Sequence, residues 1–148
     1  MILIVDDDVK LADSLERLFR YSGHDAVAVN HGMEALALLQ LRAPTLVILD
    51  LGLDAMSGLT LLTEVRQRFA EVPVVIHTAD VAQASEAAAR AAGAQDYIIK
   101  GTTGSETLVR RVEALLPSHR VEKAAHTLEE KTSHRHDELK VAATGETA

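Results

Sequence analysis

The sequence predicts an α/β fold, a doubly wound, five-stranded parallel sheet with helices on both of its faces. Short apolar runs alternate along the chain with longer stretches in which apolar residues recur every three or four positions. Most of the short runs carry no alternating polar residue, which is typical of strands buried on both faces. Strands of this kind, when helices join them, form parallel sheets with right-handed crossovers.

The first half of the chain supplies three strands and two helices. The strands are predicted at 2–5 (Ile-Leu-Ile-Val), 26–29 (Ala-Val-Ala-Val) and 45–49 (Thr-Leu-Val-Ile-Leu). Between them, apolar residues at helical spacing over 11–19 and 35–39 each mark one buried helix face.

The second half repeats this alternation. Strands are predicted at 72–76 (Val-Pro-Val-Val-Ile) and 97–99 (Tyr-Ile-Ile). Helices are predicted over 61–69, over the Ala-rich stretch 81–92 and over 108–116, because the apolar residues of each fall on one helix face.

Local signals predict the ends of two helices. Asp8 is expected to be the N-cap of the first helix, which would begin at Val9, because an Asp at this position accepts a backbone N–H and complements the helix dipole. The segment Thr-Gly-Ser-Glu at 103–106 fits a capping box for the last helix, and Pro117 can end that helix.

The composition limits the classes of function. A length of 148 residues suits one domain, and 47% hydrophobic with 25% charged residues is typical of a folded globular protein. A net charge of -7 predicts that the molecule repels nucleic acid and anionic lipid. The absence of cysteine excludes disulfides, thiolate nucleophiles and cysteine-based metal sites. The sequence has neither a basic signal-peptide start nor a membrane-spanning apolar stretch, so we expect a cytoplasmic protein.

Polar residues follow four of the predicted strands. Asp6 and Asp7 follow the first strand, Asp50 follows the third, Thr78 ends the fourth, and Lys100 follows the fifth. In open doubly wound sheets, ligands bind outside the carboxyl ends of the strands, so these side chains should converge at one edge of the sheet. Each residue alone has a simpler interpretation, as a turn residue, a helix cap or a solvated lysine. Their shared position is what indicates a site.

The chemistry of this set indicates phosphoryl transfer. Carboxylates held close together repel one another and take up protons unless a cation neutralises them. Mg²⁺ fits best, because it binds one or two carboxylates and completes its coordination with water and phosphate oxygens; Mn²⁺ is the alternative. A metal, a lysine and a hydroxyl around a nucleophilic carboxylate are sufficient for transfer to that carboxylate.

Four segments together resemble a known family. They are Ile-Leu-Ile-Val-Asp-Asp-Asp at 2–8, Leu-Val-Ile-Leu-Asp-Leu at 46–51 with Met-Ser-Gly at 56–58, Val-Ile-His-Thr-Ala at 75–79, and Ala-Gly-Ala-Gln-Asp-Tyr-Ile-Ile-Lys at 92–100. This pattern resembles the receiver domain of two-component response regulators, of the single-domain, chemotaxis-regulator-like kind, over residues 1–116. The resemblance implies a flavodoxin-like sheet with strand order 2-1-3-4-5.

The resemblance also implies a role for each carboxylate at the sheet edge. Asp50 would be the phosphoacceptor. Asp6, Asp7, Asp50 and the backbone carbonyl of Gly52 would hold Mg²⁺, with Asp7 bound directly and Asp6 through water. Lys100 would pair with the phosphoryl group.

Further residues and partners follow from the same resemblance. Thr78, with the neighbouring Ala79, would bind the phosphoryl group, and the rotamer of Tyr97 would follow Thr78. A sensor histidine kinase or a phosphotransfer protein would deliver the phosphoryl group, and the protein would signal by contact with a downstream protein. The expected contact surface is formed by residues 81–92, 97–99 and 106–116.

Two positions depart from the family pattern. The position four residues after Asp50 is usually Pro and is here Asp54, which adds negative charge beside the site. Lys100 is usually followed by a cis-Pro and then an aromatic residue, whereas Gly101 and Thr102 follow it here. We therefore expect a trans peptide bond after Lys100.

An enzyme is the competing interpretation. The acidic run after the first strand also resembles the Asp-x-Asp motif of haloacid-dehalogenase-type phosphatases, in which Asp6 would be the nucleophile and Asp8 the general acid. Lys10 stands where that motif has Thr or Val, no acidic pair follows Lys100, and Asp50 has no role. We therefore expect a phosphoacceptor that catalyses only its own phosphoryl transfer and dephosphorylation.

Residues 117–148 differ in character from the preceding domain. They hold four of the seven histidines, mixed charges and few large apolar residues, so we expect a polar, His-rich extension that is partly helical or disordered. It is too short for a DNA-binding output domain, so direct DNA binding is not expected. His134 and His136 fit a solvated tract better than a metal site. The segment 136–140 (His-Asp-Glu-Leu-Lys) weakly resembles the phosphohistidine box of sensor kinases, which would make it part of a dimerisation helix.

Overall fold

The computed structural model describes residues 1–117, and the compact unit Met1–Leu115 is described here by itself. The expectations about the extension after residue 117 lie outside the described residues. Five parallel strands form one sheet in the order β2-β1-β3-β4-β5, which confirms the predicted fold and strand order. The strands are β1 (Ile2–Val5), β2 (Ala26–Val29), β3 (Leu46–Leu49), β4 (Val74–Thr78) and β5 (Asp96–Ile99).

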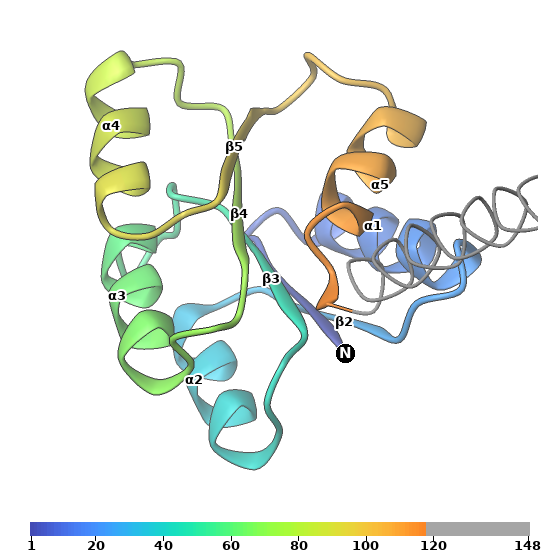
Figure 1. The fold of residues 1–148 in the computed structure, drawn as a ribbon, viewed down its shortest axis with the longest axis horizontal. Coiled ribbons are helices and arrows are strands. Elements are labelled where there is room, and N and C mark those ends of the chain that lie inside the picture. The colour runs from blue at the N-terminus through green and yellow to red at the C-terminus, as the bar shows by residue number, and fades with distance from the viewer. Residues whose placement is uncertain (118–148) are drawn as a thin grey trace, which may run out of the picture. The chain divides into compact units, whose positions relative to one another are not determined.

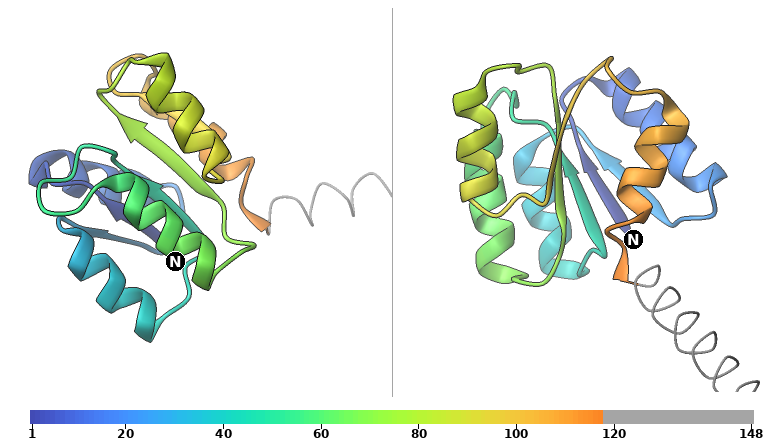
Figure 2. Two further views of the ribbon diagram at one scale, coloured as in Figure 1. Left: turned by 90° about the vertical axis from the view of Figure 1, so that its left-hand side faces the viewer. Right: turned by 45° about the horizontal axis from the view of Figure 1, so that its top comes forward.

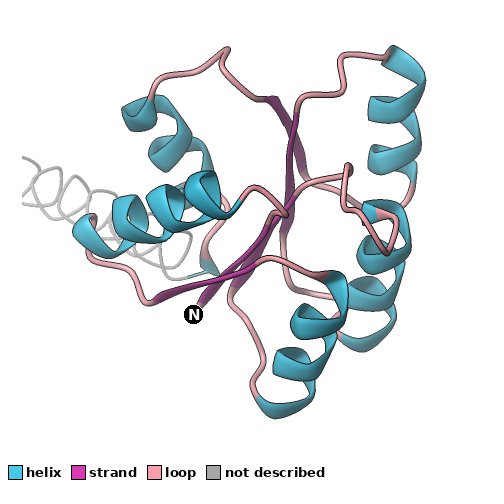
Figure 3. Cartoon of the chain, turned by 180° about the vertical axis from the view of Figure 1, so that it is seen from behind, coloured by secondary structure: helices cyan, strands magenta, loops and turns pink. Residues whose placement is uncertain are grey.

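Five helices cover the two faces of the sheet. They are α1 (Val9–Tyr21), α2 (Gly32–Leu41), α3 (Gly58–Arg68), α4 (Gln83–Ala91) and α5 (Ser105–Glu113). Figure 1 shows α2, α3 and α4 on one side of the sheet and α1 and α5 on the other, and the view from behind in Figure 3 shows the same two layers. The left view of Figure 2 looks onto the layer of α2, α3 and α4.

The three inner strands form the centre of the core. Every residue of β1, β3 and β4 is buried, whereas β2 and β5 at the sheet edges are buried only in part. Burying a large aliphatic side chain contributes about 1.5–3 kcal/mol, so these continuous apolar runs account for much of the driving force for folding. The core cluster contains Leu3, Val5, Val47, Leu49, Val74 and Ile76 from the strands and Leu61, Leu62 and Val65 from α3.

Strand β4 begins two residues later than the sequence predicted. Pro73 has no N–H to donate to a sheet ladder, and its carbonyl accepts a hydrogen bond of 3.0 Å from Val47 N as the ladder starts. Val72 donates from its backbone N to Phe69 O at 3.2 Å and so belongs to the turn after α3. The strand runs to Thr78, and His77 within it is buried.

The predicted capping box of the last helix is wrong. Gly104 is the N-cap of α5 and makes no side-chain capping hydrogen bond, so the helix starts one residue later than a box at 103–106 requires. Pro117 does not end this helix either, because α5 ends at Glu113 and is followed by a turn in which Leu115 N donates to Val112 O at 3.0 Å.

Other local predictions are confirmed. The carboxylate of Asp8 accepts a hydrogen bond of 3.2 Å from Leu11 N and caps α1. No cis peptide bond occurs in the described part of the chain, so the bond after Lys100 is trans. Gly101 has a φ of 81°, a left-handed conformation that proline cannot adopt, so this loop takes a path that the usual proline would exclude. Within residues 1–117, no helix is long and apolar enough to cross a membrane.

Candidate functional site

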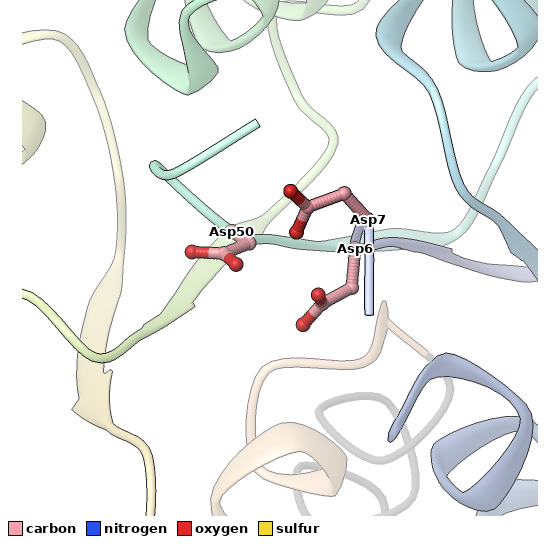
Figure 4. Close-up of side chains that lie close together, drawn as sticks. All are labelled: Asp6, Asp7 and Asp50. Atoms are coloured by element: carbon pink, nitrogen blue, oxygen red, sulfur yellow. The ribbon is translucent and has the colours of Figure 1, made fainter. Parts of the chain in front are cut away.

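The acidic residues predicted at the sheet edge come together where β1 and β3 end. The carboxylates of Asp6, Asp7 and Asp50 each offer an oxygen, and these oxygens lie within 4.8 Å of one another. Figure 4 shows the three side chains gathered at the ends of the two strands. The sheet positions them directly, because Val5 pairs with Leu49 and the backbone N of Asp50 donates to Val5 O at 3.0 Å.

Lys100, from the end of β5, bridges two of these carboxylates. Its Nζ lies 2.8 Å from Asp50 Oδ2 and 2.9 Å from Asp6 Oδ2. β4 lies between β3 and β5, so the lysine side chain crosses one whole strand to reach the acidic group. The backbone N of Lys100 donates to Thr78 O at 2.8 Å, which fixes the start of the side chain beside the end of β4.

Asp50 is buried, with 5% of its surface exposed, yet it is held in the ionised form. Burial raises the pKa of its carboxyl, but the hydrogen bond from Lys100 and the one from Gly52 N, 3.0 Å from Oδ1, together lower the pKa below its ordinary value. Asp50 is therefore charged at neutral pH, and its carboxylate can act as a nucleophile.

Asp6 has the opposite balance. It is 2% exposed, and burial raises the pKa of its carboxyl by more than the hydrogen bonds from Lys100 and from Asp8 N lower it. Lys100 remains protonated, because its two carboxylate partners raise its pKa by more than burial lowers it. The single positive charge of Lys100 thus balances only part of the negative charge of Asp6 and Asp50.

The donor set fits a hard divalent cation. Asp7 is half-buried, adds a third carboxylate and makes no salt bridge with another side chain of residues 1–117. All the side-chain donors are oxygens, and three carboxylates share one ammonium group at the site. Cations of the Mg²⁺ type prefer such ligands. The amide of Gly52 lies at the site, while the predicted role of its carbonyl stays a prediction.

The hydroxyl-bearing residues of the prediction are placed around the same edge. Thr78 is 2% exposed, and its Oγ1 accepts a hydrogen bond of 3.3 Å from Asp80 N. Its hydroxyl is also close enough to Asp50 to contribute to the lowered pKa of that carboxyl. The ring of Tyr97 is buried, its hydroxyl donates to Asp80 O at 2.9 Å, and burial raises its pKa. Ala79 is exposed.

Two acidic residues take no part in the cluster. Asp8 is engaged as the N-cap of α1, so it is not available as the general acid that the phosphatase interpretation requires. Asp54, the residue in place of the usual proline, is exposed in the loop between β3 and α3.

Two residues that the sequence analysis gave no role also shape this region. A Cβ on Gly58 would lie 2.5 Å from Asp50 O and 2.5 Å from Leu51 Cα, so only glycine lets α3 start against the backbone that carries Asp50. His77 is 7% exposed, and its Nδ1 has no hydrogen-bond partner. In the sequence, the only indication of a role for His77 is that a single polar residue directly follows an apolar run.

Comparison with known proteins agrees with this geometry. A family model described as the response regulator receiver domain matches residues 2–113. The transcriptional regulatory protein PrrA of Mycobacterium tuberculosis is 36% identical over 115 residues, which cover 78% of this chain and 49% of PrrA. The transcriptional regulatory protein BaeR of Escherichia coli is also 36% identical over 115 residues, covering 78% and 47%. The chain therefore spans about half the length of the curated relatives it matches.

Solved structures agree as well. The receiver domain of NtrX from Brucella abortus is 32% identical, with a TM-score of 0.73 and coverage of 78% of this chain and 98% of that one. A CheY-like response regulator receiver domain protein from Methanospirillum hungatei is 25% identical, with a TM-score of 0.76 and coverage of 82% and 96%.

Proposed function

The chain belongs to the response regulator receiver domain family, and from this membership we propose that Asp50 accepts a phosphoryl group and acts as the switch of a two-component signalling system. The observation that carries the proposal is the position of Lys100 Nζ, 2.8 Å from Asp50 and 2.9 Å from Asp6. Receiver domains are signalling domains, and the comparisons give no support to the phosphatase alternative.

The proposed chemistry starts from the ionised Asp50. A carboxylate oxygen attacks the phosphorus of a phosphohistidine, a new O–P bond forms, and the N–P bond breaks. The electron pair of that bond returns to the imidazole, which takes up a proton. Lys100 and the hydroxyl of Thr78 would stabilise the negative charge on the phosphoryl oxygens, which is the main contribution a protein makes to phosphoryl transfer.

Mg²⁺, or Mn²⁺ in its place, would be held by Asp6, Asp7, Asp50 and the carbonyl of Gly52. When bound, the ion would neutralise charge that the carboxylates share with the phosphoryl oxygens. The close approach of the three carboxylates supports this assignment. The domain would catalyse only the transfer of the phosphoryl group to Asp50 and the later hydrolysis of phosphorylated Asp50.

The signal would leave the site through the β5 edge of the sheet and the two helices beside it. A phosphoryl group adds a charge of about -1.5 to -2 next to Thr78 and Lys100. Thr78 contacts the backbone of Asp80, and Tyr97 of β5 contacts the same residue. Within β5, Asp96 binds Arg111 of α5 with a pair of hydrogen bonds, so β5 and α5 are joined. The proposed output surface is formed by residues 81–92, 97–99 and 106–116.

The proposed partners follow from the family and the charge. A sensor histidine kinase or a phosphotransfer protein would donate the phosphoryl group, and a downstream protein would bind the output surface, in the cytoplasm. The net charge of -7 supports recognition of a protein rather than of DNA by these residues.

Intact-mass spectrometry of the full chain with Mg²⁺ and acetyl phosphate tests the proposal. The expected result is the addition of one acid-labile phosphoryl group, which the Asp50→Asn protein does not take up. Asp54→Asn is the matched control, because it removes an exposed carboxylate from the adjacent loop and should react normally. Phosphorylation of Asp50→Asn protein, with circular dichroism confirming its fold, would show that the acceptor is another residue.

A further inference from the structure

Asn30 holds the backbone of the candidate metal site from the end of β2. It follows β2 directly, as Asp6 follows β1, and it is half-buried. Its side-chain Nδ2 donates a hydrogen bond of 3.1 Å to the backbone oxygen of Asp6. The sequence analysis gave Asn30 no role, because an Asn after a strand is an ordinary turn residue.

The Asn30 side chain replaces a hydrogen bond that the sheet itself would otherwise supply. Asp6 N donates to Val29 O at 3.2 Å, so the parallel ladder between β1 and β2 continues as far as Asp6. In a regular parallel ladder, the oxygen of Asp6 would then accept from the backbone N of His31. His31 is instead the N-cap of α2, and the donor to Asp6 O is Asn30 Nδ2. The side chain therefore extends the ladder beyond the point where the backbone turns into α2.

Asp6 is held at all of its polar atoms, whereas the carboxylate of Asp7 is not. Asp6 Oδ1 accepts from Asp8 N at 2.9 Å, and Asp6 Oδ2 lies 2.9 Å from Lys100 Nζ. Within residues 1–117, no donor group binds the Asp7 carboxylate. Figure 4 shows the two carboxylates leaving the backbone in different directions. The direction of the Asp7 side chain therefore depends on the backbone that carries it.

That backbone is fixed by the Asn30 hydrogen bond. The Asp6 carbonyl belongs to the peptide unit that joins Asp6 to Asp7, and a peptide unit is planar. A hydrogen bond to its oxygen therefore also orients its N–H and the bond to Asp7 Cα. Mg²⁺ requires near-ideal octahedral geometry, whereas Ca²⁺ accepts irregular arrangements of oxygen ligands.

We infer that Asn30 is a positioning residue that sets the cation selectivity of the site. By fixing the peptide unit between Asp6 and Asp7, it holds the Asp7 carboxylate where the site favours Mg²⁺ over Ca²⁺. The inference rests on the proposed metal site and adds to it a residue that does not touch the cation.

The test is an NMR titration of the isotope-labelled full chain with MgCl₂ and, separately, with CaCl₂. No phosphodonor is added, and the amide shifts of Asp7 and Asp50 report binding. Asn30→Leu removes the amide group at similar size and without a change in charge. Its Kd for Mg²⁺ should rise about tenfold, the lower end of the usual effect of removing a group that orients a metal ligand. Its Kd for Ca²⁺ should change little, so the selectivity for Mg²⁺ should fall by about the same factor.

Thr45→Val is the matched control. Thr45 Oγ1 donates to Met1 O at 3.0 Å, so the substitution removes a side-chain hydrogen bond to the backbone at the opposite end of β1. It should leave both affinities unchanged. Asn30→Ala removes the same amide group with a smaller side chain. It should reproduce the loss of selectivity, and it provides the test if Asn30→Leu does not fold.

Three results would overturn the inference, and they differ in what they say about the proposed function. Unchanged Mg²⁺ affinity in the folded Asn30 variants, with binding lost in Asp7→Asn, would leave the metal site in place without a role for Asn30. An equal loss of Mg²⁺ and Ca²⁺ affinity would mean that Asn30 stabilises the site without selecting the cation. An absence of saturable shifts at Asp7 and Asp50 in the native chain would contradict the metal site itself.

Discussion

The hydroxyl of Tyr97 donates a hydrogen bond of 2.9 Å to the backbone carbonyl of Asp80. Tyr97 belongs to β5, and Asp80 lies in the loop between β4 and α4. The backbone N of the same Asp80 donates to Thr78 Oγ1 at 3.3 Å. Asp80 is therefore held from both of its backbone groups, by a residue of the candidate site on one side and by an edge strand on the other.

Tyr97→Phe should lower the free energy of unfolding by about 1 kcal/mol, because it removes one hydrogen bond and leaves the ring in place. Urea denaturation measures this loss, and amide exchange at Asp80 and Ala82 should become faster. Tyr21→Phe is the matched control, since Tyr21 is 93% exposed and its substitution should change neither quantity. An equal effect of both substitutions would contradict the role of the Tyr97 hydroxyl.

Gly58→Ala should destabilise the domain by about 1–3 kcal/mol, the usual effect of overpacking a buried site. The new Cβ would lie 2.5 Å from backbone atoms of residues 50 and 51, which cannot move aside without displacing Asp50. Its rate of phosphorylation should fall as well. Thr60→Ala is the control, because Thr60 is exposed on the same helix; denaturation should show a change below about 0.5 kcal/mol.

Lys100→Met should lower stability at neutral pH by about 1–3 kcal/mol, because two buried carboxylates lose their shared cation. In the native protein, the lowered pKa of Asp50 means that its contribution is present above the unfolded pKa, about 3.9, and is lost as pH falls through the folded pKa. The raised pKa of Lys100 means that its contribution is present below about 10.4 and is lost as pH rises through the folded value.

The difference between native and Lys100→Met protein should therefore be largest between these limits and should shrink toward acid pH. Denaturation curves collected from pH 3 to pH 8 measure it. Lys10→Met serves as the control, since Lys10 is exposed on α1. A difference independent of pH would mean that Lys100 stabilises the fold by packing alone.

Arg111→Met should raise the pKa of Asp96. Burial raises the pKa of this carboxyl, but its bonds to Arg111, at 2.8 and 2.6 Å, contribute to a net lowering. The Asp96–Arg111 pair stabilises the fold above about pH 4, and this contribution is lost as pH falls through the folded pKa of Asp96. The contribution is about 1 kcal/mol, because Arg111 is partly exposed. A carboxyl NMR titration of Asp96 measures the shift, and Arg110→Met should leave it unchanged.

Mg²⁺ should raise the thermal midpoint of the full chain. A ligand present at a hundredfold excess over its Kd stabilises the folded state by about 2.7 kcal/mol. Asp7→Asn should abolish most of this effect, because it removes one of the three clustered carboxylates. Asp13→Asn, on the exposed side of α1, should retain it. Equal stabilisation of both variants would place the cation elsewhere.

Much of the fold could be predicted from the sequence because strand burial and side-chain pattern are directly related in a parallel sheet. The run at 2–5 is apolar at every position, and every one of these residues is buried. The limits of elements were less predictable, because they depend on single backbone groups. Pro73 delays β4 through its missing N–H, and Gly104 rather than Thr103 is the N-cap of α5.

The candidate site could be predicted in part, because parallel strands bring their carboxyl ends to one edge. That rule placed Asp6, Asp7 and Asp50 together, as the structure does. It could not predict that Lys100 crosses β4 to reach two carboxylates at once, since this depends on the rotamer of a long side chain. That His77 Nδ1 has no hydrogen-bond partner could not be predicted either, because sequence patterns indicate burial but not which hydrogen-bond partners a buried atom has.

The open sheet has two edges, at β2 and β5, and each edge strand is only four residues long. An exposed strand edge is a template on which another polypeptide can add a strand, and long flat edges lead to aggregation. Here a foreign strand would find few backbone groups to pair with, and at β5 it would meet the charged pair of Asp96 and Arg111 at the start of the strand. The shortness of both edge strands, and the charged pair at β5, therefore limit strand addition between copies of this domain.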